Sequence, residues 1–404
     1  MTRADRTPVL FYPSPVTVWN DAAFAERLAH TNWMANTAVL MHLNERATGD
    51  PARDWLSSWA HRWFVGDGLR VLVLGCGEGW LERAVAEWPF VAHVDAVDFA
   101  EHAVARAREL ARGIAKIEYG VVDLNHHVLP EGAYDVVVAH SVLHHIENLE
   151  HAYAQLERTM RPNATLIVNE YVGPNRFQYS DDVLSIMNAL LRCLPFELRR
   201  PYERRTRPTV EEMIANDPTE AVRAEELMAF TGRTFEVLET KELGGAVVQH
   251  LLFDIVQNFR FDDPRERSLV ELLCTIDGML TDAKRIPCDF LIAAARRKGA
   301  TVTKTARPLP PRTDQANDVE PDPLRGIPLA SRVWNGGGLD AHQRRLLRIA
   351  LLSQKPRRAN LFAEDARLGP FGRARDWEWL LAQAPRDPAI RELLETAAAI
   401  LAPT

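Results

Sequence analysis

The chain has 404 residues, of which 47% are hydrophobic and 25% charged, and its net charge is -7 at pH 7. This length predicts one large domain with appendages or two domains, and the composition is that of a globular protein. No apolar run is long enough to cross a bilayer, and the negative charge disfavours nucleic acid, so neither membrane nor nucleic acid is an expected partner. The amino terminus lacks the pattern of a secretory signal, which predicts a cytoplasmic location. The four scattered cysteines form no C-x-x-C pair, so we expect reduced thiols.

The first predicted unit, residues 1–64, is a helical amino-terminal lid. Residues 21–64 are rich in Ala, Leu and Trp at helical spacing, and Asn20 or Asp21 is a candidate cap. The sequence Gly49-Asp50-Pro51 predicts a break between two of these helices.

From residue 69 the pattern changes to short β-branched runs that indicate strands: LRVLVLG, AHVDAVD, KIEYGVVD, YDVVVAH, ATLIVNEY, TFEVLET and CDFLIAAAR. Helical stretches separate the first five runs, which favours a parallel, doubly wound α/β sheet with both faces covered. A mostly helical insertion is predicted over residues 177–230, and further helices over 246–283.

The end of the chain predicts a separate unit. Residues 299–330 are rich in Pro, Thr and Asp and indicate a linker, before which the main core is expected to end. Helical periodicity returns afterwards, so residues 331–404 are predicted to form a helical appendage. Its role is open, including whether it forms a homodimer.

The sequence VLVLGCGEGW, residues 71–80, places three glycines directly after a strand and before a helix. Such glycines let a backbone turn tightly and approach a ligand closely. A dinucleotide site favours G-x-G-x-x-G, but its last position is Trp80 here, which disfavours a nicotinamide-dependent oxidoreductase. Asp98 ends the second predicted strand and Asp123 follows the third, where carboxylates can accept from ribose hydroxyls and an adenine amino group.

Over about residues 65–298 these features resemble the class I S-adenosylmethionine-dependent methyltransferases. The resemblance implies a Rossmann-like seven-stranded, mostly parallel sheet with an antiparallel last strand near CDFLIAAAR, and S-adenosylmethionine as cofactor. We expect the cofactor to be bound by Gly75, Cys76, Gly77, Gly79, Asp98, Phe99, Asp123, Leu124 and His140. One departure is Val73, where the family usually has an acidic residue.

Acceptor residues are expected where the fourth and fifth strands end and in the segments beyond, because ligands lie at the carboxyl edge of such sheets. His250 is the first candidate for a general base and Glu170 the second. If residues near 250 are helical, Asp254 shares a face with His250 and could orient its ring. The expected substrate-binding residues are Tyr171, Arg176, Gln178, His144 and Asp254.

The sequence predicts no required metal, because the pairs His126-His127 and His144-His145 lack the i, i+4 spacing of helical zinc ligands. The favoured function is O-methylation of a small-molecule or saccharide hydroxyl by in-line transfer with a general base. Two alternatives remain open: an N- or C-methyltransferase of a natural-product intermediate, and a non-catalytic cofactor-binding assembly protein.

Overall fold

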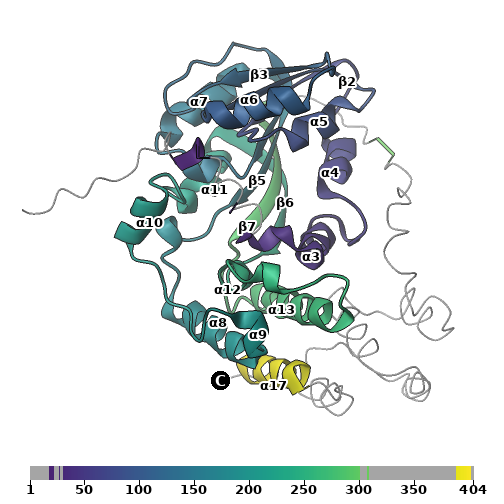
Figure 1. The fold of residues 1–404 in the computed structure, drawn as a ribbon. Coiled ribbons are helices and arrows are strands. Elements are labelled where there is room, and N and C mark those ends of the chain that lie inside the picture. Colours follow the sequence, from purple (N-terminus) through teal and green to yellow (C-terminus); the bar gives the residue numbers. More distant parts are fainter. Residues whose placement is uncertain (1–17, 22–26, 28–30, 301–306, 309–387, 402–404) are drawn as a thin grey trace, which may run out of the picture.

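The computed structural model describes residues 18–21, 27, 31–300, 307–308 and 388–401. Its centre is a seven-stranded sheet in the order β3-β2-β1-β4-β5-β7-β6 (Figure 1). The first five strands are parallel, and β7 runs antiparallel to both of its neighbours. This confirms the predicted Rossmann-like α/β class. The strands are β1 (Leu69–Leu74), β2 (Val91–Asp98), β3 (Ile117–Val121), β4 (Tyr134–His140), β5 (Met160–Tyr171), β6 (Phe235–Gly244) and β7 (Phe290–Arg297).

Both faces of the sheet are covered, as the apolar strands require. Side chains alternate between the two faces of a strand, so Val71 and Val73 of β1 enter one core cluster while Leu72 and Leu74 enter another. The first cluster contains residues of α5 (Trp80–Ala86) and α6 (Glu101–Leu110). The second contains residues of α7 (Leu149–Thr159) and α11 (Leu227–Thr234). The two clusters hold the parallel strand ends in a fixed arrangement.

The amino-terminal helices in the described residues are α3 (Thr37–Thr48) and α4 (Trp55–Trp63), preceded by a short turn of 3-10 helix, η1 (Trp33–Ala35). Asn36 caps α3 by accepting from the backbone N–H of Ala38, and Asp54 caps α4 by accepting from that of Ser57. Gly49 ends α3 with a φ of 82°, so the predicted break at this glycine is confirmed. The helix expected just after Asn20 falls largely outside the described residues.

A second helical layer lies beyond the β7–β6 side of the sheet (Figure 1). It comprises α8 (Asp181–Cys193), α9 (Phe196–Arg199), α12 (Val248–Leu252), α13 (Pro264–Asp282) and α17 (Pro388–Leu401), while α10 (Val210–Asn216) lies in the connection that follows α9. The insertion after β5 is therefore helical, as predicted.

The last helix corrects one expectation. α17 contacts α8 and α13, and its Ile390 and Leu393 are buried in the same core cluster as the sheet. The core therefore does not end before residue 299, because this part of the predicted appendage belongs to it. Most of the predicted linker and the rest of the appendage lie outside the described residues.

Two inferences from composition can be compared with the described residues. All four cysteines are free thiols, as expected. Among the described helices, none is long and apolar enough to span a membrane.

Candidate active site

The loop between β1 and α5 has the backbone shape that its glycines predict. Gly75, Gly77 and Gly79 have φ angles of 66°, 50° and 83°, which side chains with a Cβ rarely adopt. A Cβ atom at Gly75 would lie 2.5 Å from the Cβ of Val142. At Gly77, by contrast, a Cβ would meet no atom of the described residues within 4 Å. The backbone at Gly77 is therefore open to a ligand, whereas Gly75 is packed against the segment after β4.

Asp98 joins this loop to the end of β2. Its Oδ2 accepts from the backbone N–H of Gly77 at 2.9 Å, and its Oδ1 accepts from that of Ala100 at 2.9 Å. Burial raises the pKa of Asp98, which the backbone donors partly offset. Each carboxylate oxygen has two lone pairs, so ribose hydroxyls could still donate to it. Within the loop, the N–H of the buried Cys76 donates to Val97 O, and Phe99 is half-buried beside Asp98.

Asp123 lies at the same edge of the sheet. The N–H of Val122 donates to the carbonyl of Asp98 at 2.8 Å, which brings the ends of β2 and β3 together. The exposed Asp123 accepts from the backbone and side-chain N–H groups of Asn125, both at 2.9 Å, and the neighbouring Leu124 is buried. The structure thus brings together the three features from which the cofactor was inferred.

His140 lies beside this loop between two tryptophans. Its ring centroid is 5.1 Å from that of Trp55 and 5.7 Å from that of Trp80. Its Nδ1 is buried without a hydrogen-bond partner among the described residues, and burial lowers the pKa of the imidazole. An open glycine, a carboxylate and a buried polar atom with no partner all suit an adenosyl ligand.

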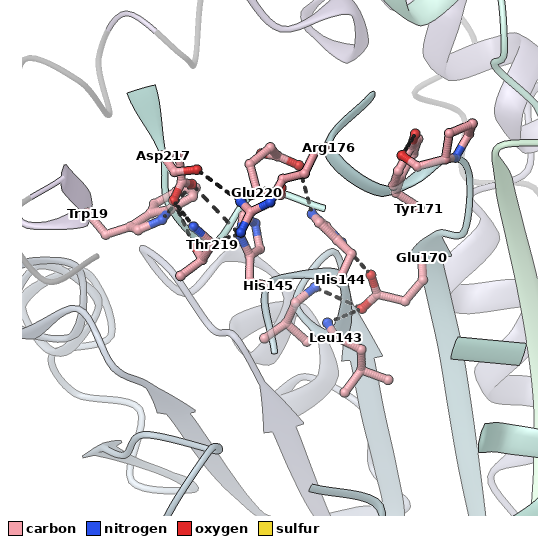
Figure 2. A network of polar contacts seen from close by, with 12 residues as sticks. Trp19, Leu143, His144, His145, Glu170, Tyr171, Arg176, Asp217, Thr219 and Glu220 are labelled. Carbon is pink, nitrogen blue, oxygen red and sulfur yellow. Dashed lines mark hydrogen bonds and ion pairs between the residues drawn. The ribbon is translucent and has the colours of Figure 1, made fainter. Parts of the chain in front are cut away.

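A second polar centre follows β4 and β5 (Figure 2). Glu170 is completely buried, and its Oε1 accepts from the backbone N–H groups of Val142 and Leu143, both at 2.8 Å. Its Oε2 lies 2.7 Å from Nδ1 of His144. This histidine belongs to η2 (Leu143–His145), and its Nε2 lies 3.6 Å from Oε1 of Glu220. Glu170, expected as a candidate base, therefore has both oxygens engaged in orienting this segment.

His145 extends the same centre. Its Nδ1 lies 3.0 Å from the hydroxyl of Thr219, which donates to Asp217 at 2.7 Å. Trp19 donates from Nε1 to the other carboxylate oxygen of Asp217 at 3.0 Å. The amino-terminal segment, the end of β4 and the insertion thus meet at one place (Figure 2).

Three expected substrate-binding residues have their polar groups engaged with the backbone. The Tyr171 hydroxyl donates to the carbonyl of Pro174, and the Gln178 amide donates to those of Arg176 and Pro208. The Arg176 guanidinium donates to the carbonyls of Asp217, Pro218 and Glu220. These contacts fasten the insertion over the ends of β4 and β5.

The expected pairing of His250 with Asp254 on one helical face is wrong. α12 ends at Leu252, and Asp254 has a φ of 59°, outside any helix. Asp254 instead accepts from the hydroxyl of Tyr202 at 3.3 Å. The expectation assumed that the helix continues from His250 to Asp254, but the chain turns after only five helical residues.

His250 lies between aromatic rings. Its ring centroid is 4.5 Å from that of Tyr179 and 5.0 Å from that of Phe177. Its Nε2 is buried, with no hydrogen-bond partner in the part of the chain that the structure describes. Burial, and secondarily the nearby Arg205, lower the pKa of His250 to about 3. The imidazole is therefore neutral and weakly basic. Phe177 and Tyr171 lie between it and His144.

Comparison with known proteins identifies the same region. A family model described as a methyltransferase domain matches residues 72–168. An uncharacterized methyltransferase of Mycobacterium tuberculosis is 33% identical over 105 residues, which are 26% of this chain and 52% of that protein. A malonyl-[acyl-carrier protein] O-methyltransferase of Halalkalibacterium halodurans is 28% identical over 110 residues, 26% of this chain and 40% of that protein. The chain thus spans about half or less of the length of these relatives.

Solved structures with some similarity include an S-adenosylmethionine-dependent methyltransferase from Mesorhizobium loti, with 19% identity and a TM-score of 0.38 over 60% of this chain and 97% of that one. Another is a geranyl diphosphate C-methyltransferase from Streptomyces coelicolor, with 13% identity and a TM-score of 0.37 over 59% and 76% of the two chains. The family-model match coincides with the glycine loop, Asp98 and Asp123. The chain therefore contains a methyltransferase domain of the class I S-adenosylmethionine-dependent type, with S-adenosylmethionine as the cofactor of this domain.

Proposed function

We propose that the protein transfers the methyl group of S-adenosylmethionine to a hydroxyl oxygen of a small molecule or saccharide. The observation that carries this proposal is the position of Val142. Its side chain packs against Gly75 of the cofactor loop, while its backbone N–H is bound by Glu170 of the second polar centre. A centre containing histidines and carboxylates thus adjoins the cofactor loop, where a hydroxyl acceptor would have to lie.

The bound cofactor supplies an electrophilic methyl group on a sulfonium. In the transfer, the acceptor oxygen forms a bond to the methyl carbon as the carbon–sulfur bond breaks, and the electron pair of that bond remains on sulfur. The chain has to align the two reactants and receive the hydroxyl proton. Because Gly75 and Val142 are in contact, the cofactor loop and the second polar centre have a fixed separation.

We assign the proton-accepting role to His144 in place of His250. Glu170 accepts a hydrogen bond from Nδ1 of His144, which leaves the lone pair on Nε2. This nitrogen faces Glu220, an acceptor-only group when ionised. A hydroxyl acceptor loses its proton as the carbon–oxygen bond forms, and His144 is placed to accept it, which supports O-methylation.

The test is formation of S-adenosylhomocysteine in the presence of pools of sugars, phenols and amines. We expect turnover with hydroxyl compounds, and we expect His144→Gln to reduce it on the order of 100-fold, the range of general-base catalysis. The matched control is His93→Gln, a half-buried residue of β2 outside both polar centres, which should retain full turnover. Methylation of amines alone would contradict the proposed acceptor, and cofactor binding without any turnover would indicate a non-catalytic protein.

A further inference from the structure

We propose that His144, His145 and Glu220 bind a divalent transition-metal ion. One ring nitrogen from each histidine and one carboxylate oxygen lie within 4.8 Å of one another. Two imidazoles and one carboxylate form a donor set typical of zinc and non-haem iron sites. The three residues come from the ends of two segments that are 75 residues apart, so no sequence spacing indicates the site.

The surroundings of His144 select the tautomer that a metal needs. An ionised carboxylate only accepts hydrogen bonds, so the 2.7 Å contact with Glu170 places the proton of His144 on Nδ1. Its Nε2 then carries the lone pair and lies 3.6 Å from Glu220. A carboxylate on the far nitrogen of a histidine is the usual support for a metal ligand.

His145 has an equivalent support. The hydroxyl proton of Thr219 goes to Asp217, so the hydroxyl oxygen accepts from Nδ1 of His145. The lone pair of His145 is thereby left on Nε2. Both histidines thus have a carboxylate behind Nδ1, directly in one case and through a hydroxyl in the other (Figure 2).

The two ligand segments are fixed to each other by the backbone. The N–H of Val222 donates to the carbonyl of His144 at 3.0 Å, and the N–H of Arg176 donates to that of Ala221 at 2.8 Å. The Arg176 guanidinium holds three further carbonyls of this turn. A site with fixed ligands loses little conformational entropy when the ion binds.

A second cluster provides the comparison. His93, Asp95 and Glu118 also lie close enough to hold an ion, but Asp95 is already paired with Arg70 at 3.0 Å, and Nε2 of His93 is bound to it at 2.9 Å. Its ligand atoms are thus engaged with each other and with a cation. This cluster therefore supplies a matched control.

The inference deepens the proposed function and, for the acceptor, rests on it. An ion with three protein ligands retains open positions that oxygen atoms of a substrate can occupy, and it lowers the pKa of a bound hydroxyl. When the ion occupies the lone pair of His144, the hydroxyl bound to the ion releases its proton to water instead of to this histidine. The acceptor class is then a compound with two neighbouring oxygen atoms, such as a vicinal diol.

The experiment is calorimetric titration of the chelator-treated full-length chain with Zn²⁺, and in parallel with Co²⁺ followed by visible absorption. We expect one ion per chain, binding at least 100-fold weaker in His145→Ala and Glu220→Gln, and unchanged binding in His93→Ala. Asp217→Asn, which alters the support of His145 without removing a metal ligand, should weaken binding by about 10- to 100-fold. Thermal unfolding and S-adenosylhomocysteine affinity report whether each variant is folded.

Lack of Zn²⁺ binding by the folded wild-type chain, or its retention in both ligand variants, would overturn the metal site. Turnover is measured separately, with and without chelator. Full turnover without metal binding would leave the methyl transfer intact and remove this inference. Metal binding without turnover on any hydroxyl compound would uphold the site and contradict the proposed function.

Discussion

The segment after β4 joins the cofactor loop to the second polar centre. Val142 contacts Gly75 through its side chain, and its backbone N–H is bound by Glu170. A methyl donor and an acceptor must approach within van der Waals distance, so a rigid link between their sites favours transfer. A methyl group added at Gly75 should therefore have a different effect from one added at Gly77.

We expect Gly75→Ala to lower both protein stability and cofactor affinity, because the added Cβ would lie 2.5 Å from Val142. Gly77→Ala meets no neighbour, so it should destabilise the chain only by the left-handed backbone strain of about 1–2 kcal/mol while weakening cofactor binding. Urea unfolding and calorimetric titration of both variants separate the two effects. Equal stability losses in both would contradict the difference in packing.

Asp289 gives a prediction about pH. Asp289 is 0% exposed, and neither carboxylate oxygen has a hydrogen-bond partner within the described ranges of the chain. Burial, with smaller contributions from Asp277 and Glu225, raises its pKa to about 7. As pH rises, the unfolded chain loses this proton at a lower pH than the folded chain does. The contribution of Asp289 to stability is therefore present below pH 4 and falls as pH rises to 7, by at most about 4 kcal/mol.

Asp289→Asn should remove that dependence. Relative to the wild-type chain, the free energy of unfolding of the variant is expected to increase from pH 4 to pH 7. Urea unfolding at several pH values measures it. A difference that stays constant across this range would show that Asp289 is ionised normally in the folded chain.

At the scale of single residues, the sequence predicts contacts best where the chemistry is local. The glycine loop and Asp98 lie next to a strand that the sequence indicates clearly, so their contact follows from the fold. Glu220, Asp217 and Thr219 lie in a polar stretch with no recognisable pattern, and they reach the histidines only through tertiary packing. The expected absence of a metal rested on spacing within histidine pairs, which says nothing about such a distant carboxylate.

At the scale of elements, the strands were predictable and the docking of the last helix was not. Alternating or continuous β-branched runs indicate strands directly. The sequence of α17 indicates an apolar face but not its packing partner, because that face could pack against any other apolar surface. In the structure its Leu393 is fully buried, and the helix packs against α8 and α13.

We therefore expect Leu393→Ala to destabilise the whole domain by about 2–5 kcal/mol, the usual cost of removing a buried leucine side chain. The exposed neighbour Arg391 provides the control, since Arg391→Ala should change stability by less than about 0.5 kcal/mol. Urea unfolding followed by tryptophan fluorescence reports the sheet domain. An unaffected unfolding midpoint in Leu393→Ala would mean that α17 is not part of the cooperative core.

For the whole molecule, the strand order explains why one edge carries the chemistry. β1 lies between β2 and β4, so the chain crosses over on opposite sides of β1 and leaves the ends of these strands accessible. The insertion after β5 and the segment containing Trp19 then meet beside this edge. The sequence predicted the sheet and the edge, whereas the closure by Asp217 and Trp19 depends on contacts between distant segments.

The most direct measurement is calorimetric titration of the full chain with S-adenosylhomocysteine. We predict one binding site per chain, weakened by about 10- to 100-fold in Asp98→Ala because charge-assisted hydrogen bonds contribute about 1.5–3 kcal/mol. Absence of binding to the folded wild-type chain, or equal affinity in Asp98→Ala, would contradict the assignment of this edge as the cofactor site.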